Sequence, residues 1–126
     1  MEELINRVVD ALNARDFEAL EALPLHPEFE FHSLFSAFEG TSLVGFEGLR
    51  RWVDDVDAIW DDFRVEVEEV RAAGDERAAV AMHVTGRAKA SGVPLDQHTG
   101  QLWTMRDGLH GRSVGYASAD EAFAAL

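Results

Sequence analysis

The sequence predicts an α+β fold in which helices pack on one face of a bent β-sheet. Two observations indicate this class: apolar residues recur at helical spacing in the first 60 positions, and apolar and polar residues alternate with period two in much of the remainder. Short turn signals join the alternating segments, which predicts consecutive antiparallel strands. A chain of 126 residues suits one core, so we expect a single domain over 1–126.

Helical periodicity is clearest at the N-terminus and in the middle of the chain. Apolar positions repeat every three or four residues over 2–14, and a second, short helix is expected between Asp16 and Pro24. A long amphipathic helix is expected from Phe46 to Trp60. The segment 36–48 has three glycines and no clean period, which predicts a loop. The tail 119–126 is helix-prone but short.

Alternation predicts an early extended segment at 29–33, a strand at 63–68, a long hairpin from 79–88 and 97–105, and a last strand at 111–117. On the hairpin, Met82 and Val84 share one face, and Gln101 and Trp103 share one face of the second strand. If these faces coincide, they form a bulky apolar floor. Small residues at alternate positions of the last strand would leave volume above it, so the pattern predicts a cavity.

Composition excludes several classes of function. With 24 acidic and 11 basic side chains, the formal charge of −13 repels a phosphate backbone, so we expect no nucleic-acid partner. No apolar run approaches the ~20 residues of a membrane span, so no membrane partner is expected. The absence of cysteine excludes disulfides and thiolate chemistry and favours a cytoplasmic location.

The five histidines do not predict a metal site. None is paired with another at helical i, i+4 spacing or at close spacing within one strand. His83 and His98 are expected to face away from the cavity, and His110 is expected to join them on the outer sheet face. We therefore expect no metal and no cofactor.

Five segments of the chain resemble the SnoaL-like polyketide cyclase family, which belongs to the nuclear transport factor 2-like (ketosteroid isomerase-like) superfamily. These are residues 14–17, 29–34, 45–49, 63–67 and 101–108, the last ending in the Asp107-Gly108 turn. The resemblance spans nearly the whole chain. It implies a cone-shaped fold, with a curved mixed or antiparallel sheet whose concave face is covered by N-terminal helices around an apolar cavity. It also implies a homodimer through the outer sheet face.

Activity does not follow from the resemblance, because this superfamily includes enzymes of several kinds and binding modules. In the ketosteroid isomerase branch the general base is an Asp, and its position resembles Ser33 here, with the oxyanion donors at Val8 and Gln101. A serine without a base does not abstract a proton from carbon at neutral pH, and valine donates nothing. Related epoxide hydrolases need two Asp and one Arg converging in the cavity. On the predicted faces no buried Asp is available for this, because Asp96 lies near the hairpin turn.

Three functions are therefore compatible with the sequence. The first is binding of a small, mostly apolar molecule in the cavity. The second is an isomerase, cyclase or hydrolase acting on a polyketide-like or terpenoid substrate, with His32 or Asp96 as acid/base. The third is a dimeric, non-catalytic accessory module. The expected ligand contacts are Phe29, Phe31, Ser33, Trp52, Met82, Val84, Gln101, Trp103, Ser113, Gly115 and Ala117.

Overall fold

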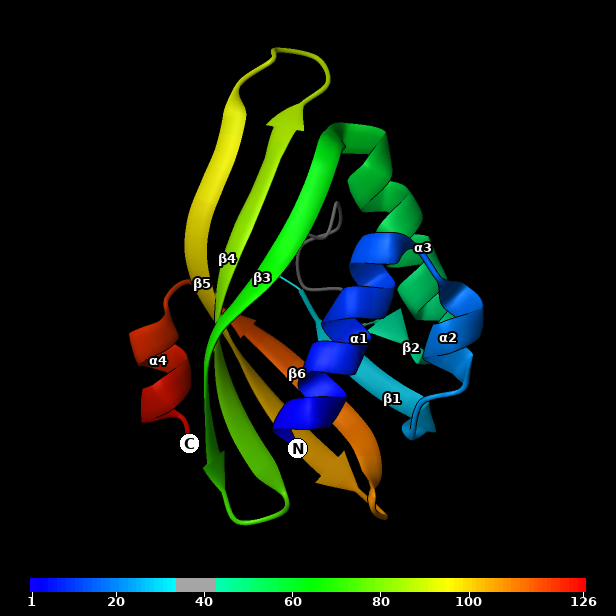
Figure 1. Cartoon of the computed structure of the whole chain (residues 1–126), viewed down its shortest axis with the longest axis vertical. Coiled ribbons are helices and arrows are strands. Elements are labelled where there is room, and N and C mark those ends of the chain that lie inside the picture. Colours follow the sequence, from blue (N-terminus) through cyan, green and yellow to red (C-terminus); the bar gives the residue numbers. More distant parts are fainter. Residues whose placement is uncertain (34–42) are drawn as a thin grey trace.

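The computed structural model describes residues 1–33 and 43–126, and it confirms an α+β architecture with a curved, open sheet (Figure 1). The sheet has the strand order β2-β1-β6-β5-β4-β3. The elements are α1 (Glu2–Ala14), α2 (Phe17–Glu21), β1 (Leu25–His32), β2 (Leu43–Val44), α3 (Gly45–Ile59), β3 (Trp60–Ala73), β4 (Arg77–Ala88), β5 (Pro94–Arg106), β6 (Leu109–Tyr116) and α4 (Ala119–Ala124).

The sheet is mixed, because β1 pairs parallel with β6 while the other neighbours pair antiparallel. The predicted long hairpin is present as β4 and β5, and Val80 lies opposite Gln101 in its register. The apolar faces of the two strands therefore coincide, as the alternation indicated. The short strand β2 lies within the segment predicted as a loop, and residues 36–42 of that loop lie outside the described residues.

The helices α1, α2 and α3 cover one face of the sheet (Figure 1). Their apolar stripes supply much of the core: Ile5 of α1, Leu20 of α2 and Val56 of α3 are at most 1% exposed. Val80 of β4 is fully buried in the same core. No helix in residues 1–33 and 43–126 is long and apolar enough to span a membrane.

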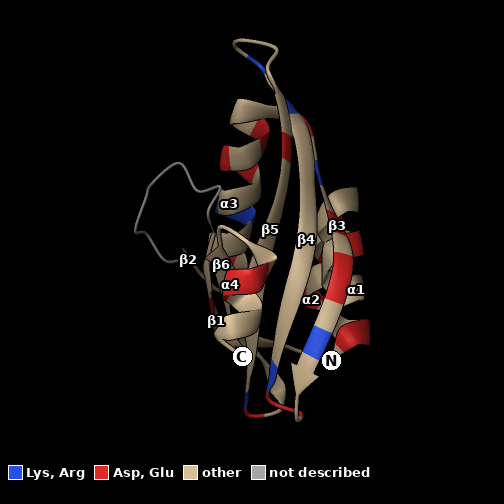
Figure 2. Cartoon of the chain, turned by 90° about the vertical axis from the view of Figure 1, so that its left-hand side faces the viewer, with Lys and Arg blue, Asp and Glu red and all other residues tan. Residues whose placement is uncertain are grey.

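The C-terminal helix α4 packs against the opposite, outer face of the sheet. Gly100 of β5 points toward it, and a Cβ at this position would lie 2.6 Å from both the Cβ of Ala122 and the carbonyl oxygen of Ser118. Only a glycine permits this close approach without a shift of the helix or strand. Figure 2 shows α4 in front of the sheet, with acidic residues coloured red on α1, α3, α4 and β3. Part of the outer face is therefore covered within the chain itself.

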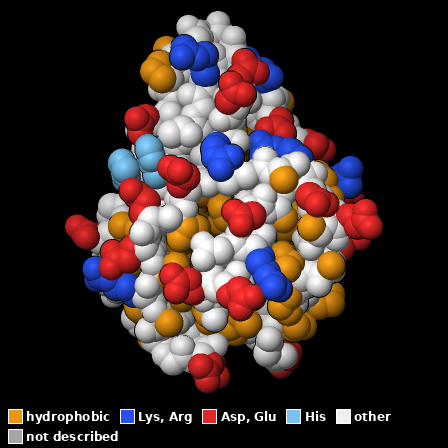
Figure 3. Space-filling view, in the orientation of Figure 1, with side chains coloured by type: hydrophobic (Ala, Val, Ile, Leu, Met, Phe, Trp, Pro, Cys, Tyr) orange, Lys and Arg blue, Asp and Glu red, His pale blue; other side chains and the backbone are white. Residues whose placement is uncertain are grey.

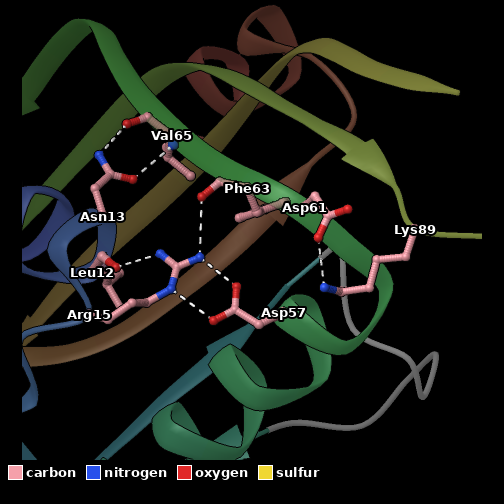
Figure 4. A network of polar contacts seen from close by, with 8 residues as sticks. All are labelled: Leu12, Asn13, Arg15, Asp57, Asp61, Phe63, Val65 and Lys89. Atoms are coloured by element: carbon pink, nitrogen blue, oxygen red, sulfur yellow. Dashed lines mark hydrogen bonds and ion pairs between the residues drawn. The ribbon is translucent and has the colours of Figure 1, made fainter. Parts of the chain in front are cut away.

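A polar clamp joins the end of α1 to α3 and β3 (Figure 4). The Arg15 guanidinium donates to both carboxylate oxygens of Asp57, at 3.0 and 2.6 Å, and to the carbonyl oxygens of Leu12 and Phe63, at 2.6 and 3.2 Å. Next to it, the Asn13 amide donates to Val65 O at 2.8 Å and accepts from Val65 N at 3.0 Å. These bonds fix the helical cover relative to the edge of the sheet.

Candidate functional site

A cavity lies between the helical cover and the inner face of the sheet. Among the described residues, its walls come from α1, β1, α3, β5 and β6, together with Ser33. The cavity volume is about 60 Å³. The residues that line it are Val8, Leu12, Leu25, Phe29, Phe31, Ser33, Leu49, Trp52, Gln101, Trp103, His110 and Ser113. No carboxylate, lysine or arginine occurs among these described walls.

The walls are held by aromatic contacts. Trp52 meets the ring of Phe31 edge-on at 5.4 Å between centroids, and it meets Phe63 in the same way at 5.9 Å. On the opposite wall the ring of His110 lies 4.3 Å from that of Trp103. The Trp103 indole N–H donates to the side-chain oxygen of Gln101 at 2.9 Å, so this amide oxygen is engaged by the protein itself.

His110 faces the cavity because β6 contains a β-bulge. Thr104 of β5 pairs with Arg112, but the next residue, Met105, pairs with His110, so Gly111 is the extra residue on β6. A Cβ on Gly111 would lie 2.5 Å from the Cβ of Arg106, so a glycine suits this position. The bulge reverses the alternation and turns His110 inward. The prediction that His110 lies on the outer face is therefore wrong.

Two ring nitrogens in these walls have no hydrogen-bond partner among the described residues. They are Nδ1 of His110 and Nε1 of Trp52, both buried. His110 is only 3% exposed, and burial lowers its pKa to about 4, because an imidazolium would lose its hydration there. At neutral pH the cavity thus presents a neutral imidazole and an indole N–H.

Seven of the predicted ligand contacts line the cavity: Phe29, Phe31, Ser33, Trp52, Gln101, Trp103 and Ser113. Met82 and Val84 are buried in the hydrophobic core but are not among the lining residues. Gly115, opposite Gln101, does not line it either, and Ala117 lies beyond the end of β6 and is exposed. The cavity therefore lies nearer to His110, at the start of β6, than the predicted contacts Gly115 and Ala117 implied.

Neither predicted acid/base residue lines the cavity. Asp96 lies on the outer face of β5, where its side chain is 69% exposed and contacts His83. His32 follows Phe31 on β1 and points to the opposite face of that strand, although its Nε2 is buried without a partner among the described residues. Neither residue belongs to the described walls, because each alternates out of phase with the inward-facing positions.

Five residues of the walls were not among the predicted ligand contacts: Val8, Leu12, Leu25, Leu49 and His110. The family resemblance had named Val8 only as the position of an oxyanion donor. Leu12 and Leu49 belong to the apolar stripes of α1 and α3, so helical periodicity could have placed them. The available signal for His110 was the glycine that follows it, since a glycine inside a strand often marks a bulge.

An open curved sheet with three helices over one face is the architecture of the nuclear transport factor 2-like, or ketosteroid isomerase-like, proteins. The chain belongs to the SnoaL-like domain family, whose model matches residues 5–110. No curated protein matches the chain.

Three solved structures show the similarity of fold. TerC, co-crystallised with polyporic acid, is 23% identical over 98% of this chain and 95% of its own, with a TM-score of 0.77. A Catenulispora acidiphila protein in complex with trimethylamine is 19% identical over 97% and 90% of the two chains, with a TM-score of 0.75. A Mycobacterium tuberculosis protein in complex with estradiol-17β-hemisuccinate is 17% identical over 93% and 92%, with a TM-score of 0.73.

Proposed function

We propose that this protein binds a small, neutral, mostly apolar molecule that carries at least one polar group. The observation that supports the proposal is the pair of buried, unpartnered nitrogens of His110 and Trp52 in the cavity walls. A buried polar group without a partner costs about 1–3 kcal/mol. A ligand that accepts from the indole N–H or pairs with the imidazole recovers this free energy on binding, whereas a pure hydrocarbon does not.

Size and charge narrow the class of ligand. Typical sites for drug-sized ligands have volumes of about 300–1,000 Å³, and the cavity here is about 60 Å³. A molecule of few heavy atoms, comparable in size to the trimethylamine bound by the Catenulispora relative, suits this volume better than a steroid does. The described walls contain no full charge, so they favour a neutral ligand over an ion.

A second candidate function is proton transfer at His110, and one observation favours it: His110 is the titratable residue among the described walls. A neutral imidazole can accept a proton, and a pKa of about 4 gives it the base strength of a carboxylate. This reading fits an isomerase or cyclase, with the Trp52 N–H as donor to a developing oxyanion. His110→Gln separates the two functions, because it should abolish turnover of a substrate while binding persists.

Binding can be tested with two probes matched in size, cyclohexanone and cyclohexane, by ligand-observed NMR titration. The ketone should bind about fivefold more tightly, since one hydrogen bond contributes roughly 1 kcal/mol. Ser113 lies in the wall and is 7% exposed, so Ser113→Leu should fill the cavity and abolish binding of both probes. Ser91→Leu makes the same change at an exposed turn position and should leave binding unaltered.

Circular dichroism must first show that Ser113→Leu is folded. Unaltered affinity in a folded Ser113→Leu variant would contradict the proposed site. Equal affinity for the two probes in the wild-type protein would show that the unpartnered nitrogens do not select a polar group.

We further propose that two copies associate through the part of the outer sheet face that α4 leaves uncovered. Leu102, Val114 and Tyr116 lie together there on β5 and β6, and each is half-buried. Tyr116→Glu places a charge in this apolar patch and should shift the protein from dimer to monomer in sedimentation velocity. Val93→Glu, at an exposed hairpin tip, is the control and should not dissociate the dimer. A dimeric Tyr116→Glu variant would exclude this surface as the interface.

A further inference from the structure

The outer face of the sheet carries a cluster of histidines and carboxylates that the cavity does not use. His83, Asp96 and His98 each place one potential ligand atom within 4.8 Å of the others. Figure 3 shows histidine side chains beside acidic ones at the left edge of the molecule. We propose that these three residues form a site for a divalent transition-metal ion such as Zn²⁺.

The sheet itself aligns the ligands. His83 of β4 and His98 of β5 are directly opposed in the antiparallel register, and their rings are stacked at 4.3 Å with an interplanar angle of 7°. Asp96 lies two residues before His98, so it projects from the same face of β5. Both strands lie inside the sheet with neighbours on each side. The three side chains therefore extend from a rigid part of the sheet, so metal binding costs little additional conformational entropy of the backbone.

Carboxylates next to the cluster support metal ligation. His98 Nδ1 lies 2.7 Å from Glu68 Oε1, an arrangement that fixes the ring and leaves Nε2 available to a metal. Metal-binding histidines commonly make such a bond through their second nitrogen, and it raises the basicity of the ligating one. Glu66 Oε2 lies 3.6 Å from His83 Nδ1 and can orient the second imidazole in the same way.

The contact between His83 and Asp96 defines where the ion would bind. His83 Nε2 and Asp96 Oδ1 are 2.5 Å apart. Zinc binds such atoms at about 2.0–2.2 Å, so tetrahedral coordination would separate the two donors to roughly 3.3 Å. Both side chains are on the surface, and a small rotation of the Asp96 carboxylate, which is 69% exposed, provides this separation.

Donor type and charge determine which ion fits. Two imidazole nitrogens and one carboxylate oxygen favour Zn²⁺, Ni²⁺ or Cu²⁺ over Mg²⁺ and Ca²⁺, which prefer oxygen. The chain carries a formal charge of −13, and Glu66 and Glu68 add negative charge beside the site. Three protein ligands leave a coordination position for water. The site lies on the face of the sheet opposite to the cavity, so this inference does not depend on the proposed ligand binding.

Isothermal titration of the chelator-treated, full-length protein with ZnCl₂ at pH 8 tests the proposal. We expect one Zn²⁺ per chain, with affinity reduced by more than 100-fold in His98→Gln and in Asp96→Asn. Glu68→Gln keeps all three ligands and should weaken binding by about 10–100-fold. His26→Gln is the control, because His26 Nε2 also lies near a carboxylate, 3.7 Å from Asp107 Oδ2, but belongs to no described three-residue cluster.

Imidazole nitrogen NMR of the wild-type protein provides a readout without a substitution. Zn²⁺ should shift the resonances of His83 and His98 and leave those of His26 in place. Absence of saturable binding, or equal affinity in wild type, His98→Gln and Asp96→Asn, would overturn the proposal. So would an equal loss of affinity in His26→Gln, since it would show that Zn²⁺ binds the acidic surface without selecting this cluster.

Discussion

His110→Phe should make the stability of this protein less sensitive to acid between pH 7 and pH 4. In the wild-type protein, burial lowers the pKa of His110 from its usual 6.5 to about 4. Between these two values the unfolded chain binds a proton that the folded chain does not. The free energy of unfolding therefore decreases as the pH falls, by about 3 kcal/mol for this one residue. Phenylalanine fills a similar volume and cannot be protonated, so this contribution should disappear.

Urea unfolding of both proteins at pH 7 and pH 4 provides the measurement. Carboxylates also titrate in this range, so the relevant quantity is the difference between the two proteins in their loss of stability. If His110→Phe and wild type lose equal stability on acidification, His110 is hydrated in the folded state and the cavity is open to water.

The strands and the core could be predicted from the sequence because a side-chain period of two fixes both the strand and its buried face. The opposition of Val80 and Gln101 follows from matching the apolar faces of two strands. This matching of faces correctly placed Gln101 and Trp103 on the side of the sheet that faces the helices, where both line the cavity. The buried stripe of α3 was equally clear, since Leu49, Val53 and Val56 recur at intervals of three or four residues.

The inward position of His110 could not be obtained from alternation alone. One extra residue, Gly111, inverts the phase of β6, and every residue before it changes face relative to the simple pattern. The outer cluster was missed for a different reason. His83 and His98 are fifteen positions apart, and only the register of β4 with β5 brings their rings together. Spacing within a single strand or helix contains no information on such a pair.

The coverage of the outer face by α4 also depends on tertiary packing. The tail is short, and its own sequence does not indicate which surface it contacts. The relevant signal is on β5, where Gly100 leaves room for Ser118 and Ala122 of the helix. A glycine inside a strand therefore marks a close approach here and a bulge at Gly111, so the residue type alone does not distinguish the two uses.

Arg15→Met should lower the free energy of unfolding by about 2 kcal/mol. Methionine retains the aliphatic stem but removes four hydrogen bonds, two to the carboxylate of Asp57 and two to backbone oxygens. Hydrogen bonds that involve a charge contribute roughly 1.5–3 kcal/mol when buried. The Arg15 and Asp57 side chains are 30% and 44% exposed, so solvent screening reduces the total. Loss of these hydrogen bonds should also weaken the packing of α1 against β3.

Arg7→Met is the matched control, because Arg7 forms an ion pair with Glu3 while both side chains are more than 60% exposed. It should change the free energy of unfolding by less than about 0.5 kcal/mol. Urea unfolding at pH 7 measures both variants. Equal effects at the two positions would show that the clamp is no stronger than an ordinary surface pair.

The pH dependence of this difference identifies which bonds of the clamp matter. The hydrogen bond from Arg15 is the largest cause that lowers the pKa of the Asp57 carboxyl below its usual 3.8, with burial opposing it. A carboxyl whose pKa is lower in the folded than in the unfolded state stabilises the fold at pH values above its unfolded-state pKa. This stabilisation is lost as the pH falls through the folded-state pKa. The stability gap between wild type and Arg15→Met should therefore narrow below about pH 4. A gap that stays constant to lower pH would assign the stabilisation to the bonds with Leu12 and Phe63, which do not titrate.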